Sequence, residues 1–116
     1  MFDFERLDLY KVCKDLNIKV FNYIRQSSHI DPFIIDQWKR ASLSILLNLS
    51  EGVGRIKNND KQHFFTIARG SVFESVAILD FLKSSEQIEE EFYQEAYAGY
   101  EQLSKMLLGL YRSYNK

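Results

Sequence analysis

The chain has little of the chemistry that marks several protein classes. Its 116 residues include one cysteine, one proline and five glycines, and the formal net charge is -1. A lone Cys13 excludes an internal disulfide, and so few glycines and prolines supply too little turn chemistry for a many-stranded sandwich or barrel. No apolar run approaches the roughly 18 residues that cross a bilayer, and no basic segment followed by an apolar one opens the chain. These absences predict a cytoplasmic protein with no membrane partner.

Hydrophobic residues make up 46% of the chain and aromatic residues 15%, which is enough to build a buried core. Apolar residues recur at steps of three and four in four segments, and the few Gly, Pro, Asn and Ser clusters separate these segments. Short connections make consecutive helices antiparallel neighbours. We therefore expect one all-α domain over residues 1–116, an antiparallel up-down-up-down four-helix bundle. Its predicted helices cover residues 7–27, 32–52, 59–83 and 93–114.

Helix ends are signalled by a few residues. Asp31 precedes the only proline and predicts an N-cap for the second helix. Asn59, with Gln62 three residues later, resembles a capping box that opens the third helix. Gly52 and Gly54 lie where the second helix is expected to close with a left-handed residue, so we predict that they either cap this helix or allow close helix packing.

The first two helices each carry a second apolar face. A helix that is apolar nearly all round is normally buried on more than one side, and one small bundle has only one core to fill. We therefore predict contacts between subunits of a homo-oligomer; the alternative is a wide core stripe in a bundle with helices of unequal length. The predicted interface residues are Leu7, Tyr10, Ile18, Phe21, Leu43, Leu46 and Leu47.

A polar stripe on the second helix faces the third helix if the two form a hairpin turning near residues 55–59. Buried charges must be paired, so the stripe predicts a network of hydrogen bonds and ion pairs that sets the helix register. Gly70, inside a helix, predicts a close backbone approach at this crossing. The predicted network comprises Arg40, Ser44, Asn48, Glu51, Arg69, Ser71 and Glu74. The opposed pairs are Arg40 with Glu74, Ser44 with Gly70 or Ser71, and Glu51 with His63.

Catalytic and metal-binding constellations are nearly absent. Neither His29 nor His63 has a Cys or His at metal-ligand spacing, and Glu74 belongs to no Glu-x-x-His repeat. Cys13 lies in the apolar stripe of its helix, which favours a buried hydrophobe over a nucleophile. We expect no enzyme activity, metal, cofactor or small-molecule substrate.

Cations gather around the connection between the second and third helices: Arg55, Lys57 and Lys61, together with His63. In an oligomer this loop is repeated around a symmetry axis, so a modest basic patch becomes a basic ring that can contact phosphates. The pI near 6.1 argues against strong general affinity for nucleic acid, and the alternative is a solvated loop.

Two spaced motifs resemble the signature of the four helix bundle protein family, also called the 23S rRNA intervening-sequence proteins. They are Ser44-Ile-Leu-Leu-Asn-Leu-Ser-Glu-Gly-Val-Gly-Arg55 and, after Phe64-Phe65, Ile67-Ala-Arg-Gly-Ser-Val-Phe-Glu74. Many members have proline where Leu46 stands, so a kink of that kind is not expected here. The matching positions are Arg40, Asn48, Glu51, Gly52, Arg55, Arg69, Gly70, Ser71 and Glu74.

The resemblance implies a bacterial cytosolic bundle without enzymatic activity, frequently a ring-shaped homopentamer, encoded in some bacteria within insertions in large-subunit rRNA genes. A related branch resembles the accessory proteins of diversity-generating retroelements, which bind nucleic acid and a reverse transcriptase. We therefore expect a pentameric bundle associated with RNA or a ribonucleoprotein through its basic loop. The alternative is a protein-interaction scaffold that recruits a partner through the aromatic-rich last helix without touching nucleic acid.

Overall fold

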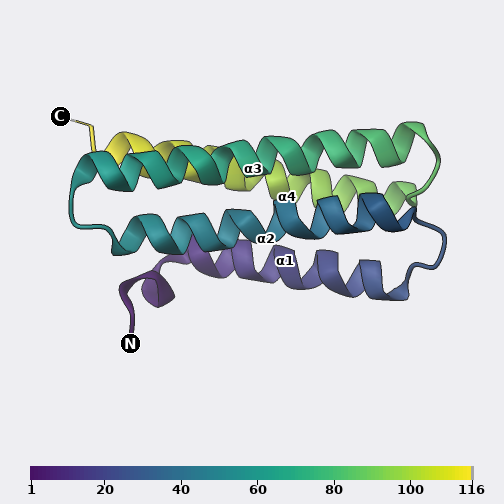
Figure 1. The fold of residues 1–116 in the computed structure, drawn as a ribbon, viewed down its shortest axis with the longest axis horizontal. Coiled ribbons are helices and arrows are strands. Elements are labelled where there is room, and N and C mark those ends of the chain that lie inside the picture. The colour runs from purple at the N-terminus through teal and green to yellow at the C-terminus, as the bar shows by residue number, and fades with distance from the viewer. Residues whose placement is uncertain (116) are drawn as a thin grey trace.

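A computed structural model of the protein describes residues 1–115. Four antiparallel α-helices pack side by side, and both termini lie at the end that carries the loop between the second and third helices (Figure 1). Each helix contacts its neighbours around a closed ring, so the α1–α2 pair and the α3–α4 pair form opposite edges of the bundle. The predicted all-α four-helix bundle is confirmed. The elements are η1 (Asp3–Arg6), α1 (Asp8–Gln26), α2 (Pro32–Gly54), α3 (Asn58–Ser84) and α4 (Glu90–Ser113).

The start of α2 follows the sequence signal, whereas the start of α3 does not. The Asp31 side chain accepts hydrogen bonds from the backbone N–H of Phe33 at 2.8 Å and of Ile34 at 3.4 Å, which confirms the predicted N-cap. Helix α3 begins at Asn58 with Lys57 as its N-cap and has no side-chain cap, so the predicted capping box is wrong. The Gln62 amide instead donates to the Tyr111 carbonyl in α4, at 3.1 Å.

The core is built from one apolar stripe of each helix, and it encloses a small polar cluster. Trp38 Nε1 donates to the Tyr100 hydroxyl at 3.0 Å, and the Ser42 hydroxyl lies 2.8 Å from the same oxygen. Burial raises the pKa of the Tyr100 hydroxyl, so the tyrosine stays neutral. Cys13 is fully buried and its pKa is raised to about 12 by burial, which confirms the predicted hydrophobe and leaves no thiolate near neutral pH.

Of the three motif glycines, Gly52 alone plays a predicted role. No glycine within residues 1–115 has a positive φ, and α2 continues through both Gly52 and Gly54 before leaving in extended conformation at Arg55. The predicted left-handed closure is therefore wrong. Gly52 allows close helix packing, as predicted, because a β-carbon there would lie 2.6 Å from Cε1 of Phe65. The close approach predicted at Gly70 is also wrong: a β-carbon there would meet no atom within 4 Å.

Candidate functional site

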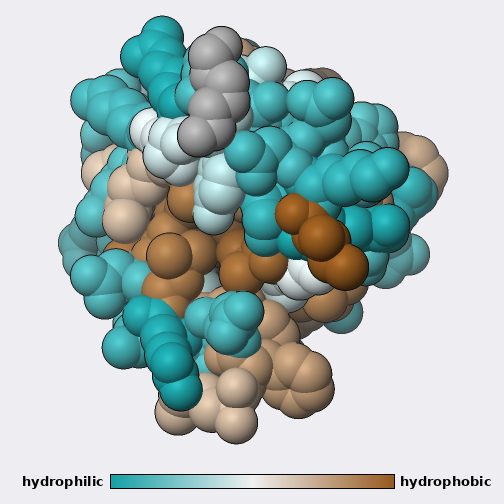
Figure 2. All heavy atoms as spheres, turned by 90° about the vertical axis from the view of Figure 1, so that its left-hand side faces the viewer, coloured by the Kyte–Doolittle hydropathy of each residue, from teal (hydrophilic) through white to brown (hydrophobic). Residues whose placement is uncertain are grey.

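The predicted basic cluster lies at the end of the bundle with both termini. Figure 2 looks onto this end, where hydrophobic side chains gather near the centre with hydrophilic ones around them. Ile56, in the loop, is 94% exposed. A shallow hollow of about 380 Å³ opens here, lined by Met1, Phe2, Asp3, Phe4, Ser50, Val53 and Gly54.

Two of the three loop cations are already engaged within the chain. Arg55 pairs with Glu51 at 2.7 Å, one helical turn earlier, and its guanidinium lies 4.5 Å from the centre of the Phe64 ring. Lys61 donates to the Val53 carbonyl at 2.8 Å, which satisfies a carbonyl at the end of α2. Lys57 is exposed and forms no ion pair with any described residue.

His63, the fourth predicted member of the cluster, is exposed and packs edge-on against the Phe64 ring, with 5.2 Å between ring centres. The guanidinium of Arg55 contacts the same ring. Among the three loop cations, Lys57 is the most available charge.

The hydroxyl part of the predicted polar network forms between α2 and α3. The Ser44 and Ser71 hydroxyls lie 2.9 Å apart, in the register that the hairpin predicts. The Asn48 amide donates to both the carbonyl and the hydroxyl oxygen of Ser44, each at 2.9 Å. These short polar side chains fit between the two packed helices. The serine pair joins α2 to α3, and the asparagine bonds lie within α2.

The ionic part of that network does not form. Arg40 and Glu74 are both exposed, and no ion pair joins them in the described structure. Glu51 pairs with Arg55 rather than with His63. The reason is position: these residues lie on the solvent side of the α2–α3 contact, where long charged side chains keep their hydration and avoid the desolvation that a buried pair requires.

Arg69 turns away from α2 altogether. Its Nε donates to the Ser104 carbonyl in α4 at 3.3 Å, so it joins α3 to α4 rather than to α2. A helical periodicity places a residue on a face of its own helix, but a side chain as long as arginine reaches either of two neighbouring helices from a position between them. The predicted membership of Arg69 in the α2–α3 network is therefore wrong.

The second apolar faces predicted on the first two helices meet along the α1–α2 edge. A groove of about 250 Å³ separates them, lined by Ile18 and Phe21 from α1 and by Leu43 and Leu46 from α2, together with Lys14, Asn17 and Arg25. Ile18 is 51% exposed and Leu47 58% exposed, so large apolar groups face solvent in this chain.

The remaining two predicted interface residues lie under the N-terminal segment. Leu7 and Tyr10 are half-buried and pack against the core, and the Tyr10 ring lies 4.8 Å from the ring of Phe4. The segment with η1 therefore covers this end of the face within the chain. The part of the apolar face that stays exposed is the middle of the α1–α2 edge, around Ile18, Leu43 and Leu47.

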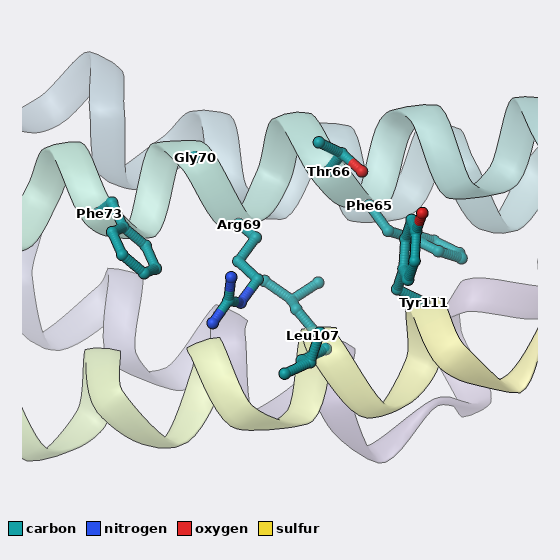
Figure 3. A pocket seen from close by; sticks show the side chains of 8 residues that line it. Phe65, Thr66, Arg69, Gly70, Phe73, Leu107 and Tyr111 are labelled. Carbon is teal, nitrogen blue, oxygen red and sulfur yellow. The ribbon is translucent and has the colours of Figure 1, made fainter.

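Sequence reasoning missed a larger groove on the opposite edge, between α3 and α4. Its volume is about 460 Å³. Figure 3 shows Arg69 and Phe73 projecting from α3 toward α4, with Leu107 and Tyr111 on the facing side. The available signal was Phe73, a large aromatic residue that falls outside the core stripe of α3 and is 57% exposed. The lining residues are Phe65, Thr66, Arg69, Gly70, Phe73, Leu107, Leu108 and Tyr111.

Two negative findings apply to residues 1–115. No group of three or more His, Cys, Asp and Glu side chains is arranged to hold a metal ion. None of the described helices combines the length and the apolar character needed to cross a membrane.

These features define the class of protein: an antiparallel four-helix bundle with apolar grooves on two opposite edges and a basic loop at one end. The sequence model of the family described as 23S rRNA-intervening sequence protein matches residues 5–109. The chain belongs to this family, as its motifs predict.

A solved structure has the same fold. It is a crystal structure of a protein with unknown function from the S23 ribosomal protein family of Bacteroides thetaiotaomicron VPI-5482. The two chains are 18% identical and superpose with a TM-score of 0.82, over 89% of this chain and 97% of the other. No curated protein matches the sequence.

Proposed function

We propose that this protein is a non-enzymatic cytoplasmic bundle that assembles into a homo-oligomer, with five subunits as the number to test, and that acts in association with RNA. The observation that carries the assembly is the α1–α2 edge, where both helices present large apolar side chains to solvent around one groove. Monomeric proteins rarely expose contiguous apolar patches larger than a few hundred Å².

Energetics favour covering this edge. Burying one large aliphatic side chain contributes roughly 1.5 to 3 kcal/mol. Ile18, Leu43 and Leu47 are each between 38% and 58% exposed, so about half of that contribution remains available from each of them in a subunit contact. A cyclic oligomer has as many interfaces as subunits. The association free energy then depends on how well the neighbouring subunit fits against the α1–α2 edge.

Light scattering at low micromolar concentration tests the assembly. We expect the wild type to have the mass of an oligomer and the double variant Ile18→Ser/Leu47→Ser to have the mass of a monomer with unchanged helicity. Phe33→Ser is the matched control, since Phe33 is 70% exposed and does not line the α1–α2 groove. A monomeric wild type, or a variant that assembles as well as the wild type, would refute the role of this edge.

The RNA-associated half of the proposal is supported by the family and by the loop with Lys57, Arg55 and Lys61. Phosphate contacts predict an affinity for structured RNA that falls steeply as salt rises. Changing all three residues to alanine should weaken binding and flatten its salt dependence, by about one unit of log–log slope for each phosphate that the variant no longer neutralises. Lys19→Ala is the control, because Lys19 pairs with Glu95 at 3.2 Å on a different part of the surface.

The alternative function, a protein-interaction scaffold, takes the same measurement as its test. If the wild type binds no RNA even at low salt, the RNA-associated proposal fails. Recruitment of a protein partner through α4 is then the better account, because aromatic side chains such as Tyr97, which is 39% exposed, are enriched at protein interfaces.

A further inference from the structure

The groove between α3 and α4 has the dimensions of a ligand site. Its volume of about 460 Å³ falls within the roughly 300 to 1,000 Å³ of typical small-ligand pockets. Leu107, Leu108 and Phe65 supply apolar walls, and Arg69 is the one charged side chain in the lining. Figure 3 shows the guanidinium of Arg69 between Phe73 and Leu107. The site is therefore an apolar slot with a cation beside it.

Charge near the groove is mostly basic, although Glu101 lines the adjoining hollow together with Phe73 and Ser104. Residues 61–73 and 102–115, the parts of α3 and α4 nearest the termini, contain no Asp or Glu. They carry Lys61, Arg69, Lys105 and Arg112, and Lys105 and Arg112 lie on the same side of α4 as the lining residue Leu108 by helical spacing. The other half of this helix pair is acidic: Glu74, Asp80, Glu90, Glu91, Glu95 and Glu101 against Lys83. This division favours a polyanionic partner at the groove end.

The aromatic groups of the groove are arranged as a stacking surface. Phe73 is 57% exposed, and the Arg69 guanidinium lies 4.9 Å from the centre of its ring. The bond from Arg69 Nε to the Ser104 carbonyl holds that guanidinium, and no described carboxylate pairs with it. Planar bases stack on aromatic rings and on guanidinium planes, whereas an acidic peptide would satisfy only the charge.

Gly70 opens the wall of the groove. A glycine inside a helix costs about 1 kcal/mol relative to alanine, and most such glycines are explained by packing within the chain. At Gly70 a β-carbon would meet no atom of the protein within 4 Å, so packing inside this chain does not require the glycine. Its absence of a side chain leaves the backbone of α3 open to a flat group between Thr66 and Phe73.

We propose that the α3–α4 groove binds an unpaired nucleotide of single-stranded RNA. The base stacks against the exposed ring of Phe73 beside the open backbone at Gly70, and the neighbouring phosphates lie toward Arg69, Lys105 and Arg112. This inference rests on the RNA-associated half of the proposed function, but it assigns the contact to the groove rather than to the loop alone. Because every base can stack on an aromatic ring, this site should prefer unpaired over paired RNA and show little preference for sequence.

Fluorescence anisotropy with a labelled 12-nucleotide RNA that cannot pair with itself tests the proposal on the full-length protein. We expect Phe73→Leu and Arg69→Gln each to weaken binding at least fivefold, and Gly70→Val to weaken it without lowering the thermal midpoint. Phe33→Leu and Arg40→Gln are the matched controls: both positions are exposed and outside both grooves, and we expect wild-type affinity. A fully paired duplex of the same length should bind the wild type more weakly.

The outcomes separate this proposal from the proposed function. If the groove variants bind as the wild type does while the alanine variant of Arg55, Lys57 and Lys61 loses binding, the groove proposal is overturned and the loop contact stands. If the duplex binds as tightly as the single strand, base stacking is overturned. A groove variant that changes the mass of the oligomer identifies the groove as a subunit contact and overturns the proposal. No binding by the wild type at low salt refutes both RNA contacts.

Discussion

Replacing Gly52 with alanine should destabilise the protein, although the same substitution usually stabilises a helix. An alanine Cβ would lie 2.6 Å from Cε1 and 2.9 Å from Cδ1 of Phe65, and 3.1 Å from Cβ of Phe64. The Phe65 ring is 1% exposed and rigid, so it relieves the overlap only by displacing its core neighbours. Alanine contributes about 1 kcal/mol through helix propensity, whereas a surplus carbon in a packed core costs about 1 to 3 kcal/mol. We expect a net loss of up to about 2 kcal/mol.

Urea unfolding followed by far-ultraviolet circular dichroism measures this change. Gly70→Ala is the matched control: it makes the same substitution in a neighbouring helix where a β-carbon meets no atom within 4 Å, so it should raise the free energy of unfolding by up to about 1 kcal/mol. Phe65→Leu should cost less in the Gly52→Ala background than in the wild type, because the smaller side chain removes the overlap. If Gly52→Ala stabilises the protein as Gly70→Ala does, the packing argument is refuted.

Three further predictions concern stability. Tyr100→Phe removes the acceptor of Trp38 Nε1–H and should cost about 1 to 3 kcal/mol in urea unfolding, whereas Tyr97→Phe, at an exposed hydroxyl, should change little. Burial raises the pKa of Cys13 from 9.0 to about 12. Well below pH 9 the thiol is protonated in both the folded and the unfolded protein, so it does not make stability depend on pH. Above pH 9 the thiol ionises in the unfolded chain but not in the folded one, so the free energy of unfolding falls. Between pH 9 and 12 this loss is about 4 kcal/mol, and Cys13→Ala should lack that part of the alkaline decline. Glu74→Ala should change the free energy of unfolding by less than about 0.5 kcal/mol, since the side chain is exposed; a loss of several kcal/mol would show that it is paired.

Sequence patterns predicted the bundle well because each helix has a strong period and ends near a recognisable residue. Asp31 caps α2 as expected, since an N-cap depends only on residues two or three positions along the chain. Gln62 does not belong to a capping box, because α3 begins at Asn58 with Lys57 as its N-cap, and its amide donates to a carbonyl of α4. The sequence therefore misplaced this helix start and did not predict the partner in α4.

The candidate sites divide in the same way. The hairpin register predicted the contact of Ser44 with Ser71, because short side chains at a helix crossing have only one neighbour to meet. It did not predict the partners of Arg40 or Arg69, because long charged side chains choose between water and two neighbouring helices. The α3–α4 groove was missed because its two walls come from different helices, and the period of one helix does not show which side chains face it from the other.

By itself the sequence determined the number of helices, their buried stripes and the family, since these depend on spacing along one chain and on ordered motifs. Tertiary structure alone decided which glycine is packed and which is open, because Gly52 faces the Phe65 ring while Gly70 faces a groove. It also decided which charges are free. Both properties depend on which side chains of the neighbouring helix lie opposite. Helical periodicity shows only which residues share a face of their own helix.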